Sequence, residues 1–247
     1  MKPNYLSLFV LLISILACGF PSSTPATPTF NPLPPTPNLP FSAGPVPQAS
    51  IAPAVSSFRD DFDGALDPRW TWLREDPSAW SLVVTPGWLH INLSTSGYLS
   101  SLPSNVLTLP APQGDFDLRT KIRFSPKSNF EFSGLVIIFD QKMVLQAGRA
   151  FCDVGTCVGN GFYFDNLKNG VTVGGNFGKP GNTDDSLVRI VRQGNIYTAY
   201  YQVDFVNWMQ LGSHTVDSQP ISVGLIAAQA PSAGNYAEFD WFEISQP

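Results

Sequence analysis

The sequence has little charge and few side chains of the kinds that bind metals or act as general bases. Only 13% of the 247 residues are charged, the net charge is −5, and His90 and His214 are the only histidines. No basic stripe is present, so we expect no nucleic-acid partner. The chain also lacks the His-Glu-x-x-His pattern of zinc hydrolases and the Gly-x-Ser-x-Gly pattern of serine hydrolases. No local motif therefore indicates either of these enzyme classes.

Long apolar runs are also lacking, apart from one near the start. Lys2 precedes an apolar stretch over 6–17, which is shorter than the roughly 20 residues of a membrane-spanning helix and is typical of a secretory signal. The stretch ends in Ile-Leu-Ala before Cys18. This ending resembles the lipobox of bacterial lipoproteins, in which the Cys carries lipid and becomes the mature N-terminus. We expect a signal peptide over 1–17, lipidation at Cys18 and a membrane-anchored lipoprotein of the cell envelope that faces outside the cytoplasm. An ordinary signal peptide that contains a Cys is the alternative.

Charged residues are absent from 19–57, a segment rich in Pro, Ser and Thr. Such a composition buries too little apolar surface to fold, and Pro favours extended polyproline II. We therefore expect 18–57 to be a disordered stalk that holds the following domain away from the membrane.

From Phe58 onward, short runs rich in Val, Ile, Phe, Tyr and Thr alternate with turn residues. No long segment has a helical repeat of apolar residues, and short β-rich runs indicate strands. We expect one all-β domain over 58–247, a two-sheet antiparallel sandwich of the jelly-roll type, and a monomer. The run 134–139 is apolar on both faces, which predicts a central strand covered on both sides. The expected strands cover 80–84, 88–93, 105–109, 116–124, 134–140, 143–151, 161–165, 171–174, 187–193, 196–203, 208–211, 221–228 and 236–244.

A series of short motifs runs through this domain. It includes Asp-Asp-Phe-Asp-Gly at 60–64, Leu-Asp-Pro-Arg-Trp at 66–70, Pro-Gly-Trp-Leu at 86–89 and a closing Phe-Asp-Trp-Phe at 239–242. The series resembles the concanavalin A-like domain at the C-terminus of family 43 β-xylosidases and related stand-alone domains of unknown function. The resemblance implies a concanavalin A-like jelly roll with paired N- and C-terminal strands, usually a non-catalytic module. The sequence holds no counterpart of the β-propeller catalytic domain of those xylosidases, so the resemblance does not imply their activity.

The last strand contains three acids with the spacing Glu-x-Asp-x-x-Glu, at Glu238, Asp240 and Glu243. This spacing resembles the catalytic strand of family 16 glucanases, where two carboxylates serve as nucleophile and general acid. On a regular strand Glu238 and Glu243 point to opposite faces, and a β-bulge near Trp241 would bring them to one face. A glycoside hydrolase is therefore one hypothesis. The alternative is a closing strand that pairs with 58–62 and exposes its acids to solvent.

Asp60, Asp61 and Asp63 form an acidic turn, which Asp240 would approach if the terminal strands pair. Carboxylate oxygens suit Ca²⁺, so one structural calcium is a hypothesis for this cluster. The alternative is ordinary turn chemistry, in which Asp side chains bond to the backbone. We expect no other cofactor.

Trp88, His90 and Asn92 share the outer face of the run 88–93, because the residues between them are apolar. Ring faces can stack on sugars while polar neighbours bind hydroxyls, and binding sites are mostly apolar with a few placed polar groups. We predict a carbohydrate-binding site at these residues, with Trp72 as a further candidate. The alternative is that the Trp side chains are core residues.

Cys152 and Cys157 remain as an even pair if Cys18 carries lipid. They flank the turn-prone tetrapeptide 153–156, and a pair of cysteines in an oxidising compartment predicts a disulfide. A metal site is the alternative, which lacks further Cys or nearby His ligands.

These observations favour a surface-displayed, non-catalytic domain that binds a carbohydrate polymer or glycan. A glycoside hydrolase that uses Glu238 and Glu243 is the second hypothesis. A protein-binding structural module of the cell envelope is the third.

Overall fold

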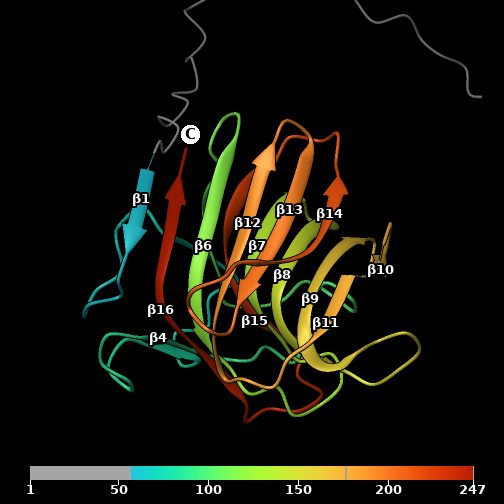
Figure 1. Ribbon diagram of the computed structural model, residues 1–247. Helices are drawn as coiled ribbons and strands as arrows, with labels where there is room; N and C mark the ends of the chain where they lie inside the picture. Colours follow the sequence, from blue (N-terminus) through green and yellow to red (C-terminus); the bar gives the residue numbers. More distant parts are fainter. Residues whose placement is uncertain (1–56, 176, 247) are drawn as a thin grey trace, which may run out of the picture. The chain divides into compact units, whose positions relative to one another are not determined.

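The computed structural model describes residues 57–175 and 177–246, and these residues form two antiparallel β-sheets without an α-helix (Figure 1). Accordingly, no helix in these ranges is long and apolar enough to cross a membrane. The two sheets confirm the all-β sandwich predicted from the sequence. The predicted signal peptide over 1–17, the lipidation site Cys18 and the stalk up to residue 56 lie outside the described residues.

Sheet A follows the order β14, β13, β12, β6, β16, β4 and β3, and β1 pairs with β16 (Figure 1). The pairing of β1 with β16 joins the first and last strands of the domain, as the family resemblance implied. The strands of sheet A are β1 (Ser57–Asp60), β3 (Trp80–Ser81), β4 (Leu89–Asn92), β6 (Phe116–Arg123), β12 (Asp185–Gln193), β13 (Ile196–Gln202), β14 (Met209–Thr215) and β16 (Tyr236–Ser245).

Sheet B follows the order β10, β9, β8, β7, β15, β5 and β2, and β11 also pairs with β9. The central place of β7 agrees with the doubly apolar run 134–139. The strands of sheet B are β2 (Thr71–Leu73), β5 (Val106–Pro110), β7 (Phe132–Asp140), β8 (Met143–Cys152), β9 (Gly159–Lys168), β10 (Val171–Thr172), β11 (Phe177–Pro180) and β15 (Ser222–Ala228).

Each run predicted from the sequence overlaps an observed strand. The sequence did not predict β2 or β11, which are short and carry too few residues to show an alternating pattern. The run 80–84 was predicted too long, since only Trp80 and Ser81 pair with β4. Beyond Ser81 the chain turns, and the Ser81 hydroxyl accepts hydrogen bonds from the backbone N–H groups of Val83 and Val84.

The core lies between the sheets and is built from the inward side chains of alternating strands. Leu89 and Ile91 of β4 are fully buried there, as their alternation with polar residues predicts. Phe239 and Phe242 of β16 and Phe116 of β6 belong to the same cluster. Each fully buried side chain of this size contributes about 1.5–3 kcal/mol of transfer free energy, so this cluster is the main source of stability.

The outer face of sheet B is also covered, by the segment 94–104 that connects β4 to β5. We call this segment the strap. Its Tyr98 and Leu99 pack on apolar side chains of the sheet, including Val136, Val144 and Leu167. The backbone N–H of Gln229 donates to the carbonyl of Ser96 in the strap. This cover explains why β7 is buried on both of its faces.

Glycines allow close backbone approach between the central strands of sheet B. A Cβ at Gly148 would lie 2.0 Å from the carbonyl oxygen of Ser133, and a Cβ at Gly134 would lie 2.2 Å from that of Ala147. Gly224 of β15 has a similar contact with the next strand. Glycine inside a strand often marks such a bend or close approach, so these positions exclude every side chain.

We expect Gly148→Ala to destabilise the domain by more than Gly64→Ala. Gly64 has a φ of +82° and open space around it, so its substitution costs only the left-handed conformation, about 1–2 kcal/mol. Gly148→Ala adds a clash with backbone that cannot move alone, of the overpacking kind that costs about 1–3 kcal/mol or more. Chemical denaturation of both variants measures the difference. Equal stability of Gly148→Ala and the unsubstituted domain would contradict the close approach.

Candidate functional site

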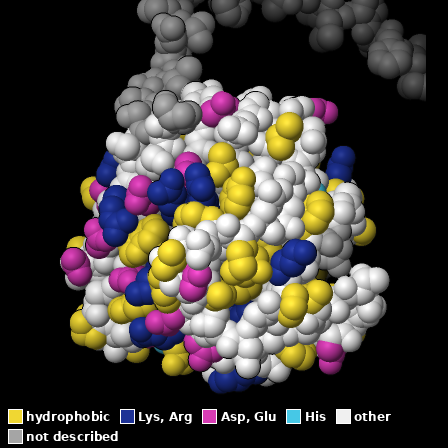
Figure 2. Space-filling view, viewed as in Figure 1, with side chains coloured by type: hydrophobic (Ala, Val, Ile, Leu, Met, Phe, Trp, Pro, Cys, Tyr) yellow, Lys and Arg dark blue, Asp and Glu magenta, His cyan; other side chains and the backbone are white. Residues whose placement is uncertain are grey.

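The outer face of sheet A carries hydrophobic side chains interspersed with basic and acidic ones (Figure 2). Side chains alternate across a strand, so the charged residues of β6 point outward while its apolar residues and Thr120 point inward. The outward residues of the two central strands form a paired ladder. Arg119, Lys121 and Arg123 of β6 lie opposite Glu243, Trp241 and Glu238 of β16, respectively.

A β-bulge interrupts β16 at Asp240, because the register with β6 shifts between Phe239 and Trp241. The bulge lies where the sequence suggested one, and it brings Glu238 and Glu243 to the same outer face. The hydroxyl of Thr120 donates to the carbonyl of Trp241 at 2.6 Å. On the outer side, Lys121 Nζ lies 2.6 Å from Asp240 Oδ2. These two contacts hold the extra residue from both faces.

Glu238 and Glu243 share a face, but their backbone positions lie far apart along the sheet. Their partners on β6 are Arg123 and Arg119, and four strand residues correspond to about 13 Å. Glycosidases place their two carboxyl groups about 5–5.5 Å apart for retention and about 6.5–9.5 Å apart for inversion. Each acid also has its own cation, since Glu243 pairs with Arg59 at 3.0 Å. The spacing and the separate cations favour the interpretation of β16 as a closing strand over that of a catalytic strand.

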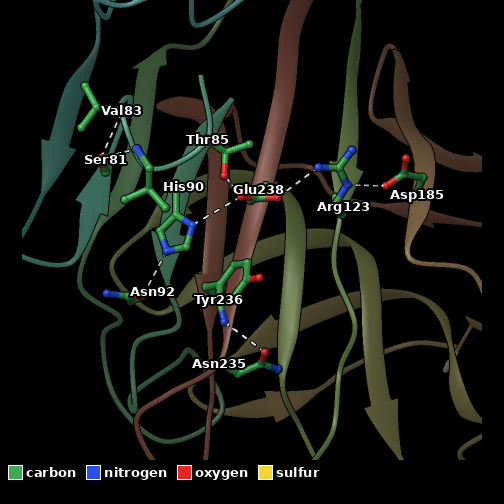
Figure 3. A network of polar contacts seen from close by, with 11 residues as sticks. Ser81, Val83, Thr85, His90, Asn92, Arg123, Asp185, Asn235, Tyr236 and Glu238 are labelled. Carbon is green, nitrogen blue, oxygen red and sulfur yellow. Dashed lines mark hydrogen bonds and ion pairs between the residues drawn. The ribbon is translucent and has the colours of Figure 1, made fainter. Parts of the chain in front are cut away.

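Glu238 is the centre of a polar network on this face (Figure 3). Its carboxylate accepts hydrogen bonds from the Thr85 hydroxyl and from Arg123 Nη1, the latter at 3.3 Å. His90 Nδ1 lies 3.6 Å from the same carboxylate. Arg123 Nε donates to Asp185 at 2.9 Å. Because Glu238 is buried beneath these partners, it fixes Arg123 in place.

His90 lies beneath Tyr236 and is therefore not the exposed ring of this site. The two rings stack with their centroids 4.4 Å apart and an angle of 29° between them (Figure 3). His90 is only 8% exposed, whereas Tyr236 is 47% exposed. Asn92 is exposed beside them, and its Oδ1 lies 3.2 Å from His90 Nε2. The ring available to a ligand is that of Tyr236.

Trp88 is half-buried and serves as a support for cations. The guanidinium carbon of Arg123 lies 4.1 Å from the centroid of the Trp88 ring, and Lys121 Nζ lies 4.8 Å from it. Such cation–π contacts contribute about 0.5–1 kcal/mol at exposed sites. The structure therefore brings Trp88, His90 and Asn92 to one face, as predicted, but with cations over the Trp88 ring.

Trp72 lies apart from these residues. It belongs to β2 in sheet B, where its ring packs on Trp80 with centroids 5.0 Å apart and contacts the core. Its role is to close one edge of the sandwich between the two sheets. Sequence alone grouped Trp72 with Trp88 because both lie in one Trp-rich segment.

A hollow with polar and aromatic walls lies where β6 ends and β16 begins. We call it the Tyr236 hollow, and its volume is about 140 Å³. It offers one exposed aromatic ring, two basic groups, an acid and an amide, which is the mixture that a small polar ligand requires. It is lined by Arg123, Phe124, Ser125, Lys127, Asp184, Asn235 and Tyr236.

The walls of the Tyr236 hollow are held by a buried carboxylate. Glu131 accepts hydrogen bonds from the backbone N–H of Lys127 at 2.6 Å and from Asn235 Nδ2 at 2.7 Å. Asn235 Nδ2 also donates to the carbonyl of Ser125 at 3.1 Å. A carboxylate that accepts several N–H groups makes strong, charge-assisted bonds, so these contacts order the segment 124–131.

The acidic turn does not fit a calcium site. Asp60 accepts hydrogen bonds from the backbone N–H groups of Phe62 and Asp67 and from Trp70 Nε1, at 2.8–3.0 Å. Asp61 pairs with Arg59 and Asp240 pairs with Lys121, while Asp63 joins neither pair. Within 57–175 and 177–246, no three His, Cys, Asp or Glu side chains gather as metal ligands would. Asp60 instead joins β1 to the turn that follows it.

Cys152 and Cys157 form a disulfide, with their Cα atoms 5.5 Å apart. The bond closes the short loop between β8 and β9, on the side of sheet B that faces the strap. These two side chains are therefore not available as metal ligands.

Sequence reasoning missed Tyr236, Arg123 and the 124–131 segment as site residues. Alternation in 236–239 places Tyr236 on the same face as Glu238, which is a signal that the sequence carries. The pairing of Tyr236 with Asn92 depends on contact between strands more than 140 residues apart. No local pattern contains that pairing.

Solved structures with a similar fold come from several organisms. The chain matches a xylan β-1,4-xylosidase from Bacillus halodurans C-125 with a TM-score of 0.67 and 19% identity, covering 82% of this chain and 41% of that chain. It matches the Bacteroides ovatus protein "Xyloglucan PUL GH43B" with a TM-score of 0.67 and 22% identity, covering 76% and 39%. The chain thus spans less than half the length of these two proteins.

A functionally unknown protein from Saccharomyces cerevisiae is matched over nearly its whole length. Its TM-score is 0.56 and its identity is 16%, covering 72% of this chain and 97% of that chain. Identities this low show the fold alone. Among curated proteins, none matches the chain.

The model of one protein family matches most of the described domain. The family is described as "Beta xylosidase C-terminal Concanavalin A-like domain", and the match covers residues 59–245. The two antiparallel sheets and the pairing of β1 with β16 agree with this match. The chain therefore belongs to the family of concanavalin A-like domains found at the C-terminus of β-xylosidases.

Proposed function

We propose that this protein is a lipid-anchored, surface-displayed domain that binds carbohydrate and does not catalyse a reaction. The observation that carries the proposal is the exposed ring of Tyr236, which is stacked on His90 and lies beside Arg123 and Asn92. A flat ring with hydrogen-bonding groups at its edge suits a sugar, whose ring has apolar faces and polar edges.

The rigidity of the Tyr236 hollow supports this role. His90 fixes the plane of Tyr236 from behind, and Glu238 with Asp185 fixes Arg123. Because these side chains are already ordered, a ligand loses little free energy in ordering them. The Tyr236 hollow offers one exposed ring, so we propose weak binding of individual sugar units.

Anchoring would make weak binding effective. The predicted lipid on Cys18 and the Pro-rich segment 18–57 would hold many copies of the domain at one surface. Binding of several tethered copies to one polymer raises the effective concentration and the overall avidity. A polymer or a densely displayed glycan is therefore the proposed partner.

The names of two similar proteins suggest which polymers to test first. One is a xylan β-1,4-xylosidase, and the printed name of the other contains the word xyloglucan. Xylan and xyloglucan are therefore the probes that we choose.

We expect the purified domain to be retarded in gels that contain xylan or xyloglucan, and Tyr236→Ala to weaken this binding about tenfold, or 1.4 kcal/mol. The loss follows from removal of the exposed ring. Tyr236→Phe keeps the ring and is expected to bind as the unsubstituted domain does. Affinity electrophoresis and calorimetry measure these effects.

Tyr200→Ala is the matched control, since Tyr200 is a half-buried ring on the same sheet and does not line the Tyr236 hollow. If Tyr236→Ala and Tyr200→Ala weaken binding equally, the Tyr236 hollow is not the carbohydrate-binding site. Retardation by neither polymer would remove xylan and xyloglucan as ligands of this domain.

We expect no release of reducing sugar from xylan or xyloglucan by the purified domain. The reason is the separation of about 13 Å between the backbone positions of Glu238 and Glu243 along the sheet. Reducing-end assays of the domain and of Glu238→Gln and Glu243→Gln test this. Hydrolysis that either substitution abolishes would establish the glycoside hydrolase hypothesis instead.

We expect Cys18→Ser to release the protein from the membrane fraction of a bacterial host. Stable anchoring needs more than one acyl chain. Cys18 is the proposed site of all the acyl chains, so its substitution removes the anchor. Fractionation and incorporation of labelled fatty acid measure the effect, with Cys152→Ser as the control. Labelling that persists in Cys18→Ser would exclude this anchor.

A further inference from the structure

A second hollow lies on the outer face of sheet B, on the opposite side of the sandwich from the Tyr236 hollow. Leu99 of the strap, Phe130 and the disulfide of Cys152 and Cys157 form its rim, and Asp165 of β9 lies within it. We call it the Asp165 hollow. Its volume is about 90 Å³, and most of its lining is apolar or aromatic.

Asp165 lacks the partners that other buried or half-buried carboxylates of the domain have. Its single hydrogen bond comes from Gln146 Nε2 at 3.3 Å. In the described residues it takes part in no ion pair. By comparison, Asp117 accepts from two arginines and Glu131 from three N–H groups. The Asp165 carboxylate therefore has free acceptor capacity and no balancing charge.

Gln146 of β8 lies directly opposite Asp165 in the ladder. Its side chain is buried, with 1% of the residue exposed, and its Oε1 atom has no hydrogen-bond partner among the described residues. An unpaired buried carbonyl oxygen costs about 1–3 kcal/mol. Asp165, which lines the hollow, and its cross-strand neighbour Gln146, which does not, thus both accept fewer hydrogen bonds than they could.

Two residues at the rim have backbone conformations that residues other than glycine rarely adopt. Phe130 has a φ of +73° and Gln229 has a φ of +67°. The side chain of Gln229 donates from Nε2 to the carbonyl of Phe130 at 2.9 Å, which ties the two strained residues together. Residues held in such regions cluster at binding and active sites. Phe130 is also 43% exposed, which leaves a large ring at the mouth of the hollow.

The lining of the Asp165 hollow suits a slender chain better than a sugar ring. Its volume is about 90 Å³, against about 140 Å³ for the Tyr236 hollow. Its walls are mostly apolar around one carboxylate, so they offer few groups that could bind the hydroxyls of a sugar. Such a hollow admits the end of an unbranched chain.

We propose that the Asp165 hollow binds a primary ammonium group at the end of an alkyl chain. The ammonium supplies the positive charge that Asp165 lacks and the N–H donors for the free acceptor sites of its carboxylate. The apolar wall of Leu99 and Phe130 receives the alkyl chain. Aromatic rings near the cation, among them Tyr163, favour a positive charge through their ring faces.

The ionisation of the hollow is consistent with this ligand. Burial raises the pKa of Asp165 to about 6, so at pH 8 it is a carboxylate without a counter-ion. Tyr163 is the only other titratable group in the lining, and burial raises its pKa too, so it remains neutral. Arg149 of β8 points to the inner face of the sheet, where its guanidinium lies 4.9 Å from the Phe162 ring. Bound ammonium favours the carboxylate, so binding weakens as the pH falls through about 6.

The test is titration of the isotopically labelled domain with n-butylammonium at pH 8, followed by NMR. We expect saturable shifts at Leu99, Tyr163 and Asp165, and binding about tenfold tighter than that of the neutral probe 1-butanol. We also expect the affinity for butylammonium to fall about tenfold between pH 8 and pH 5. Nα-acetyl-lysine methylamide, tested beside butylammonium, shows whether a lysine side chain of a peptide reaches the hollow as a free amine does.

Asp165→Asn is the decisive variant, because it keeps the shape of the side chain and removes the charge. It should lose butylammonium binding and should melt at a higher temperature than the unsubstituted domain at pH 8 but not at pH 4. The sign follows from the raised pKa, since the folded state binds the proton more tightly and loses stability as the carboxyl ionises. Asp217→Asn, at an exposed acid outside the hollow, is the matched control and should retain binding.

Three outcomes would overturn the proposal. They are equal binding of butylammonium and 1-butanol, unchanged binding in Asp165→Asn, and shifts confined to residues outside the Asp165 hollow. None of these results bears on the binding of xylan or xyloglucan at Tyr236, so the two proposals can fail separately.

Discussion

The bulge at Asp240 is the constraint on which the rest of sheet A depends. It lets Phe239 and Phe242 both enter the core while Glu238 and Glu243 both face outward. Without the extra residue, the strand alternation would place either Phe242 or Phe239 in solvent. The Thr120 hydroxyl and the Lys121 ammonium hold the bulge from opposite faces. The position of Glu238 beneath Arg123, and so the geometry of the Tyr236 hollow, follows from this arrangement.

The two outer faces of the sandwich differ in how their charges are balanced. On sheet A the acids and bases are paired, and cations lie over aromatic rings, as Arg59 does over Trp241 at 4.6 Å. Such a face is well solvated and still exposes aromatic rings. On sheet B the strap covers apolar residues, and the carboxylate of Asp165 is left without a cation. The same fold thus offers two hollows of different size and charge.

Membership of the β-xylosidase C-terminal domain family establishes the architecture of this chain but not its ligand. Domains of similar fold with 19–22% identity occur within proteins about twice the length of this chain. A fold hosts many functions, and function depends on the residues of particular sites. In this chain the proposed ligands depend on Tyr236, Arg123 and Asp165. None of these three residues belongs to the motifs at the start of the domain.

The sequence by itself determined the class of fold, most strands and, for two of the strands, the side that enters the core. Alternation in 88–93 and 116–124 is sufficient for this, because side-chain direction in a strand repeats every second residue. The family motifs then determined the pairing of the first and last strands. Even the bulge left a local signal, a change of phase in the apolar residues after Trp241.

Only the tertiary structure decided which side chains cover one another. Tyr236 covers His90, Arg123 covers Trp88, and Trp72 packs on Trp80. The pairing of Gln146 with Asp165 and the cover of the strap over sheet B are likewise contacts between strands or segments. A local pattern fixes the face of a residue but not its neighbour on the next strand, because register and sheet order depend on burial over the whole domain. For that reason the sequence identified the face of the candidate site, and the fold decided which ring on it is exposed.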